Sequence, residues 1–122
     1  MKKSNLNFTV NQTDNLVIFK LNNKKLDAEL SGELKAKFLI YSQQDVEALI
    51  IDLSVVEYVD SAGLGALLLA KRQMNQYGYP VILVGVNENV MNLINISQIQ
   101  TQFHFFNSIE EAIEALSSDE SI

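Results

Sequence analysis

The sequence predicts an α/β domain in which about four helices pack on a mixed sheet of four to five strands. Residues 48–53 and 81–86 are apolar at nearly every position, which is typical of strands buried in the middle of a parallel sheet. Residues 61–77 between them carry a helical pattern, so the three segments form a strand–helix–strand unit with a right-handed crossover. A short polar break near the N-terminus predicts a hairpin, which adds an antiparallel strand.

The hairpin and the first helix come first along the chain. Residues 8–11 and 16–21 are the expected strands, separated by the polar break at residues 13–15. The first helix is expected to follow Asp27, because an aspartate carboxylate accepts hydrogen bonds from the unpaired N–H groups of a first helical turn. Its apolar residues recur at helical spacing: Leu30, Leu34, Phe38 and Tyr41.

The second helix carries a clear apolar stripe, and Gly78 and Pro80 then end it. The residues of this stripe are Gly63, Leu67, Ala70, Met74 and Tyr77. Asn87 is expected to cap a short third helix that turns Val90, Met91, Leu93 and Ile94 inward.

The C-terminal part predicts one more strand and one more helix. Residues 103–106 fit a short edge strand. Ser108 and Glu111 have the spacing of a capping box, in which each side chain bonds the backbone N–H of the other residue. The apolar stripe of this helix is Ile109, Ala112, Ile113 and Leu116. Residues 117–122 are expected to form a frayed acidic tail.

Composition restricts the classes of function. The 122 residues contain no cysteine and one histidine, His104, which excludes disulfides, zinc–thiolate sites and thiol catalysis. The net charge is −6. This charge argues against a nucleic-acid partner, because nucleic acids require a basic surface. No apolar run is long enough to span a membrane, and the N-terminus lacks the apolar region of a signal peptide. We expect one cytoplasmic domain over residues 1–122, with its core at residues 8–116.

One segment, residues 52–65, has a pattern that indicates a functional role in addition to a structural one. A buried strand ends there, a turn follows, and Asp60 and Ser61 open the second helix. Ser61 therefore lies at a helix N-terminus, where the backbone N–H groups are unpaired and the dipole is positive. A phosphate on Ser61 would add about −1.5 to −2 charges at the helix end that tolerates them. The simpler interpretation is that the Asp–Ser pair only caps the helix and that Gly63 and Gly65 only allow close packing.

The string Asp60-Ser61-Ala62-Gly63-Leu64-Gly65, preceded by Asp52-Leu53-Ser54, resembles the signature of STAS domains. The resemblance extends from about Phe8 to Leu116. It implies an anti-sigma factor antagonist that binds an anti-sigma factor when unphosphorylated and so releases a sigma factor. It further implies that this partner is an ATP-using serine kinase and that Ser61 is its phosphoacceptor. The partner-binding residues implied are Asp27, Asp60, Ser61, Ala62, Gly63 and Leu64.

Two positions depart from the family pattern. Lys24 and Lys25 stand where the family often has glycine and glutamate, which reverses the local charge beside Asp27. Ala62 stands where a second hydroxyl often follows the phosphoacceptor. The resemblance implies no catalytic residue, cofactor or metal in this chain, and it leaves a homodimer open.

Three alternatives compete with this hypothesis. A serine hydrolase would need Ser61 and His104 as a catalytic pair, but Val59 replaces the first glycine of the Gly-x-Ser-x-Gly elbow. A phosphate-binding loop is the second alternative. Gly63 and Gly65 lack the Gly-Lys-Ser/Thr end of a P-loop and the third glycine of a dinucleotide-binding motif. The third alternative is a constitutive STAS adapter subunit of a lipid-transport or stress-signalling complex. Phosphorylation of Ser61 would distinguish the switch from the adapter.

Overall fold

Five strands form one sheet in the order β1-β2-β4-β6-β7 in the computed structural model, which describes residues 5–13 and 15–118. The β1–β2 pair is antiparallel and the remaining pairs are parallel, so the predicted mixed sheet is confirmed. Asp14 of the predicted hairpin turn and residues 119–122 of the predicted tail lie outside the described residues. The strands of this sheet are β1 (Phe8–Thr13), β2 (Leu16–Leu21), β4 (Ala48–Asp52), β6 (Val81–Val84) and β7 (His104–Phe106).

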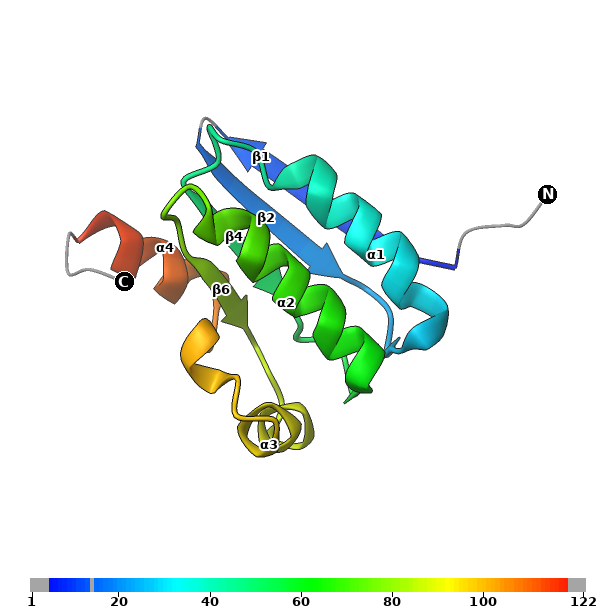
Figure 1. Cartoon of the computed structure of the whole chain (residues 1–122). Helices are drawn as coiled ribbons and strands as arrows, with labels where there is room; N and C mark the ends of the chain where they lie inside the picture. Colours follow the sequence, from blue (N-terminus) through cyan, green and yellow to red (C-terminus); the bar gives the residue numbers. More distant parts are fainter. Residues whose placement is uncertain (1–4, 14, 119–122) are drawn as a thin grey trace.

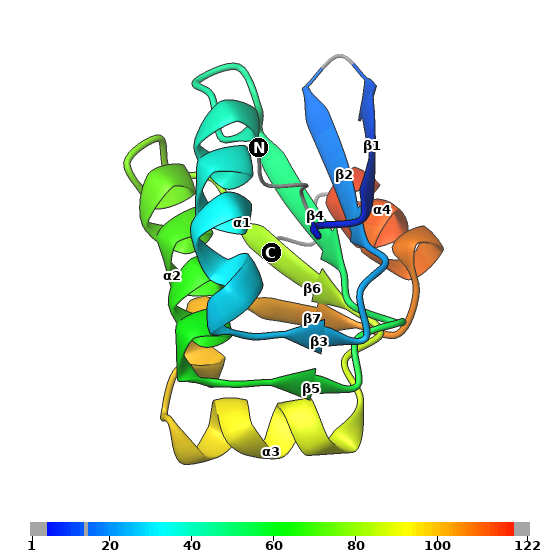
Figure 2. The same cartoon turned by 90° about the vertical axis from the view of Figure 1, so that its right-hand side faces the viewer.

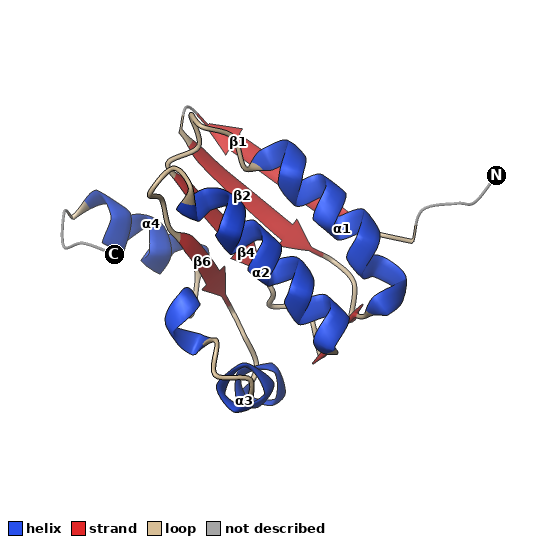
Figure 3. Cartoon of the chain, viewed as in Figure 1, coloured by secondary structure: helices blue, strands red, loops and turns tan. Residues whose placement is uncertain are grey.

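Helices cover both faces of the sheet (Figures 1 and 3). The longest two, α1 and α2, lie side by side on one face, and α4 covers part of the other face. The third helix, α3, lies below the end of the sheet (Figure 2). The bounds are α1 (Ala28–Tyr41), α2 (Ser61–Asn75), α3 (Glu88–Ile96) and α4 (Ile109–Ser117), with a 3-10 turn, η1 (Gln100–Gln102), before β7.

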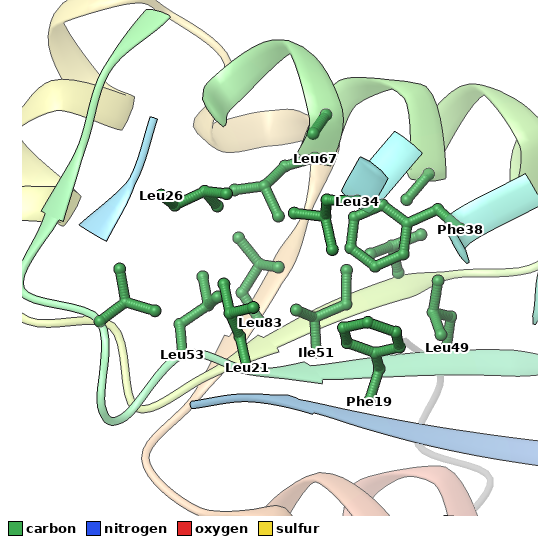
Figure 4. Close-up of a cluster of buried hydrophobic side chains, with 14 of the residues drawn as sticks. Phe19, Leu21, Leu26, Leu34, Phe38, Leu49, Ile51, Leu53, Leu67 and Leu83 are labelled. Atoms are coloured by element: carbon green, nitrogen blue, oxygen red, sulfur yellow. The ribbon is translucent and has the colours of Figure 1, made fainter. Parts of the chain in front are cut away.

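The larger core lies between the sheet and the α1–α2 layer (Figure 4). Phe19 is central to it, because its ring stacks on Phe8 at 4.9 Å between centroids and meets Phe38 edge-on at 5.1 Å. A smaller core lies under α4 and contains Ile50 and Ala112. Strand β4 is therefore apolar at successive positions because both of its faces are covered.

A second, two-stranded sheet was not predicted. Strands β3 (Lys25–Leu26) and β5 (Tyr58–Val59) pair in parallel, with Lys25 opposite Tyr58 and Leu26 opposite Val59. Each strand leads into one of the two long helices, β3 into α1 and β5 into α2. The small sheet therefore sets where both helices begin.

The predicted ends needed small corrections. Strand β6 stops at Val84 rather than at residue 86, because Gly85 takes a φ of 71° that a strand does not allow. Helix α2 ends at Asn75 rather than at Tyr77, and β4 ends at Asp52 rather than at Leu53. Strand β1 extends two residues beyond residue 11, β7 begins at His104 rather than at residue 103, and Ser117 still belongs to α4.

The three predicted N-caps outside α2 are confirmed. Asp27 accepts from the N–H of Glu29 at 3.1 Å, Asn87 from Val90 at 2.8 Å, and Ser108 from Glu111 at 3.1 Å. The second hydrogen bond of the α4 capping box, which the Glu111 carboxylate accepts, differs from the prediction. The Glu111 carboxylate accepts from the N–H of Asn107 at 3.4 Å instead of that of Ser108.

Candidate functional site

The N-termini of α1 and α2 meet at one corner of the molecule (Figure 2). Strands β3 and β5 are parallel neighbours, so the helices that follow them begin side by side. Asp27 stands between β3 and α1, and Asp60 stands between β5 and α2. The two aspartates therefore hold equivalent positions, 33 residues apart in sequence and adjacent in the fold.

Asp60 binds both helices with one carboxylate. Its Oδ1 accepts from the N–H of Gly63 at 2.9 Å, which caps α2. Its Oδ2 accepts from the N–H of Ala28, the first residue of α1, at 3.1 Å. Two positive helix termini thus share one negative charge, an arrangement that stabilises both ends. Asp60 is the cap of α2, which leaves Ser61 free of that role.

Ser61 is the first residue of α2, and its side chain is exposed. The N–H groups of a first helical turn point outward along the helix axis and lack partners within the helix. An anion attached at this position would lie at the positive end of the dipole. The predicted placement of Ser61 at a helix N-terminus is therefore confirmed.

The other residues of the string divide into surface and core. Ala62 is half-buried at the corner, whereas Leu64 is buried in the main core. Gly63 is buried because the first turn of α2 lies directly on β3. A Cβ there would overlap the carbonyl oxygen of Leu26, whereas a Cβ at Gly65 would meet nothing within 4 Å. Gly63 therefore allows α2 to pack closely on β3, as the simpler interpretation of the sequence expects.

A groove of about 470 Å³ opens beside Ser61, between β5 and α3. Its lining includes Tyr58 and Asn89, and neither residue was a candidate from the sequence. Val90 and Leu93 also line it, although their helical spacing predicted only a role in the core. No local sequence signal points to the groove, because its walls come from separate elements. In the structure Asn87 links them, since its Nδ2 donates to the carbonyl of Val56 at 3.2 Å.

His104 lies elsewhere in the fold. It is on β7, and burial together with the charge of Lys71 lowers its pKa. Lys71 lies ten residues after Ser61 on α2, which is about 15 Å along the helix axis. Ser61 and His104 are therefore not brought together, and the serine-hydrolase alternative lacks its base.

In the described part of the chain, no set of three His, Cys, Asp or Glu side chains is placed to hold a metal ion. None of its helices combines the length and the apolar character needed to cross a membrane.

The fold and this corner define a small α/β domain whose distinctive feature is an exposed serine at a helix N-terminus. The chain belongs to the STAS domain family, whose model matches residues 7–112.

One relative and two solved structures illustrate what the chain is similar to. An anti-sigma-B factor antagonist of Listeria monocytogenes is 29% identical over 85 residues, which cover 70% of this chain and 73% of the relative. The unphosphorylated form of the anti-sigma factor antagonist SpoIIAA has a TM-score of 0.78 at 22% identity, covering 92% of this chain and 97% of that one. The phosphorylated form of the Bacillus cell fate determinant SpoIIAA gives 0.71 at 21%, covering 90% and 99%.

Proposed function

We propose that this chain is an anti-sigma factor antagonist whose binding to its partner is switched by phosphorylation of Ser61. The observation that carries the proposal is the exposed Ser61 at the start of α2, beside Asp27 and Asp60. The anti-sigma factor antagonist among its relatives and the phosphorylated SpoIIAA structure support it. The unphosphorylated chain would bind an anti-sigma factor that is also a serine kinase, and a sigma factor would be released.

The position of Ser61 suits a switch that leaves the fold unchanged. A phosphate placed at a helix N-terminus meets unpaired N–H groups and a positive dipole, so the fold has no need to rearrange. The phosphate therefore acts at the interface itself. A partner that places an apolar group on this corner would have to strip water from the phosphate, and a loss of 1.4 kcal/mol already lowers affinity about tenfold.

The surface offered to the partner is the corner of the two helices. We propose that Asp27, Asp60, Ser61 and Ala62 contact it directly. Gly63 and Leu64 lie beneath them and would act by fixing the position of the first turn of α2. The kinase supplies the ATP site, so the chain itself needs no cofactor and performs no catalysis. We place this exchange in the cytoplasm.

The test begins with phosphopeptide mass spectrometry of the protein from its own cells, across growth and stress conditions. A phosphate on Ser61 that varies with conditions is expected. Purified Ser61→Ala protein then serves as bait for the kinase and should bind it without regulation. Ser61→Asp should bind at least about tenfold more weakly, and equal affinities of the two variants for the kinase would refute the switch.

Lys24 and Lys25 favour a second candidate function, a constitutive adapter of a lipid-transport or stress-signalling complex. Both lysines are exposed and line a separate groove with Asp27 and Glu29. A basic pair there would suit a different partner from one that binds an acidic corner. The adapter predicts that Ser61 is never phosphorylated and that a transporter subunit or scaffold protein, rather than a kinase, co-purifies.

A further inference from the structure

The groove beside Ser61 has an apolar interior. Val59 and Val90 are almost fully buried at its base, and Leu93 is half-buried in its wall. Tyr58 is 52% exposed. A pocket of several hundred Å³ with apolar walls is the usual shape of a site that receives a side chain or a ligand.

The groove is held open by hydrogen bonds. Asn87 caps α3 through Oδ1, which accepts from the N–H of Val90 at 2.8 Å. Its Nδ2 donates to the carbonyl of Val56 at 3.2 Å, just before β5. One side chain therefore fixes α3 against the segment that forms the opposite wall. A partner that binds a preformed groove loses less free energy to ordering.

The charge of the groove is one-sided. Glu57 and Asp60 are the carboxylates of its lining, and the lining contains no lysine or arginine. Lys24 and Lys25 are backbone neighbours of Glu57 and Tyr58, but they line the other groove, with Asp27. The Asp60 carboxylate is engaged by two N–H groups, whereas Glu57 is exposed. Complementarity therefore favours an occupant with a positive charge beside Glu57.

We propose that the groove receives an aliphatic side chain of the serine kinase, with a lysine or arginine of the same kinase segment beside Glu57. This inference rests on the proposed function and names the anchor point of the partner. Ser61 lies on the rim, so a phosphate there obstructs the entry of the side chain by its bulk and its bound water. Inhibition by the phosphate is therefore expected to persist in high salt, where charge effects weaken.

Two asparagines of α3 provide a matched test. Asn89 and Asn92 are both exposed, and only Asn89 lines the groove. The probe is the purified kinase that phosphorylates Ser61, titrated calorimetrically into each variant. Asn89→Trp fills the groove and should weaken binding at least about tenfold, whereas Asn92→Trp should stay within about twofold. Equal affinities of the two variants would overturn the inference.

The charge is tested by Glu57→Gln against Glu47→Gln, since Glu47 is exposed and lines neither of these grooves. Glu57→Gln should weaken binding about threefold to tenfold at low ionic strength, and the difference should shrink as salt is added. Glu47→Gln should leave the affinity unchanged. An effect of Glu57→Gln that does not depend on salt would contradict the basic flank.

The outcomes distinguish an error in the role given to the groove from an error in the proposed function. If Ser61→Asp weakens binding of the kinase while Asn89→Trp does not, the switch stands and the groove is not the anchor. If Ser61→Ala protein captures no serine kinase, the proposed function is wrong and the inference falls with it. Thermal melting of each variant shows whether it folds as the wild type does.

Discussion

Asp60 shows how a single side chain can join two parts of a chain. Its two carboxylate oxygens accept from the N–H groups of Gly63 and Ala28, which belong to different helices. Asp27 accepts through Oδ1 from the N–H of Glu29, within its own helix. The Asp–Ser pair predicted a cap, but nothing local could indicate the second hydrogen bond, because Ala28 is 32 residues away.

We predict that Asp60→Asn destabilises the protein by about 1 kcal/mol more than Asp27→Asn. Asparagine caps a helix as well as aspartate does, so each variant retains its own cap. The asparagine side chain has a single acceptor oxygen. In Asp60→Asn this oxygen caps α2, and the N–H of Ala28 loses its acceptor. Urea denaturation measures the difference, and equal losses for the two variants would mean that the link to α1 adds nothing to stability.

The two glycines of α2 make a second matched pair. Gly63→Ala should cost about 1–3 kcal/mol, because the new methyl group overlaps the backbone of Leu26. Gly65→Ala should stabilise the helix by up to about 1 kcal/mol, because its Cβ has open space. Thermal or urea denaturation of both variants checks the prediction, which fails if Gly63→Ala is as stable as the wild type.

Among the secondary-structure elements, α2 is the one on which both the core and the site depend. Its first residue is Ser61, and Leu67 on its buried face lies against the core of the sheet (Figure 4). Met74 on the same helix is also fully buried. The apolar stripe predicted from the sequence is buried except at Tyr77, which lies after the helix has ended. Packing of α2 against the sheet therefore fixes the position of Ser61.

Leu67→Ala should destabilise the protein by about 2–5 kcal/mol, because Leu67 is 0% exposed and its removal leaves a cavity. Leu39→Ala is the control, since Leu39 on α1 is 47% exposed, and it should cost less than about 1 kcal/mol. Both are measured in urea. A loss below about 1 kcal/mol for Leu67→Ala would place this residue outside the well-packed core.

The elements that the sequence predicted carry a recognisable apolar pattern. It is periodic in the four helices and in β2, and it is a continuous apolar run in β4 and β6. Strands β3 and β5 have two residues each, which is too short for any period, and their pairing joins segments 33 residues apart. The groove was missed for the same reason, because it lies between β5 and α3. The partner-binding roles of Asp27, Asp60, Ala62, Gly63 and Leu64, and the phosphorylation of Ser61, stay predictions.

The contribution of His104 to the stability of the whole protein is expected to fall on mild acidification. Burial and Lys71 lower the pKa of His104 in the folded state. The unfolded chain therefore takes up this proton first, and stability is lost as the pH falls from about 6.5 through the folded pKa. Melting temperatures of wild type and His104→Gln between pH 7 and 5 test this. The variant should lose less stability over that interval, and parallel curves would contradict the role of His104.

The order of strands in the main sheet, β1-β2-β4-β6-β7, is also their order along the chain. Each new strand of this sheet therefore pairs with the strand of the same sheet that precedes it in the chain. A chain leaving the ribosome could extend the sheet strand by strand, with α4 docking last on the second core. The corner that holds Ser61 is complete once β6 and α3 have emerged. Loss of α4 alone would therefore expose Ile50 and Ile82 to the chaperones and proteases of the cell, while the corner would still be made.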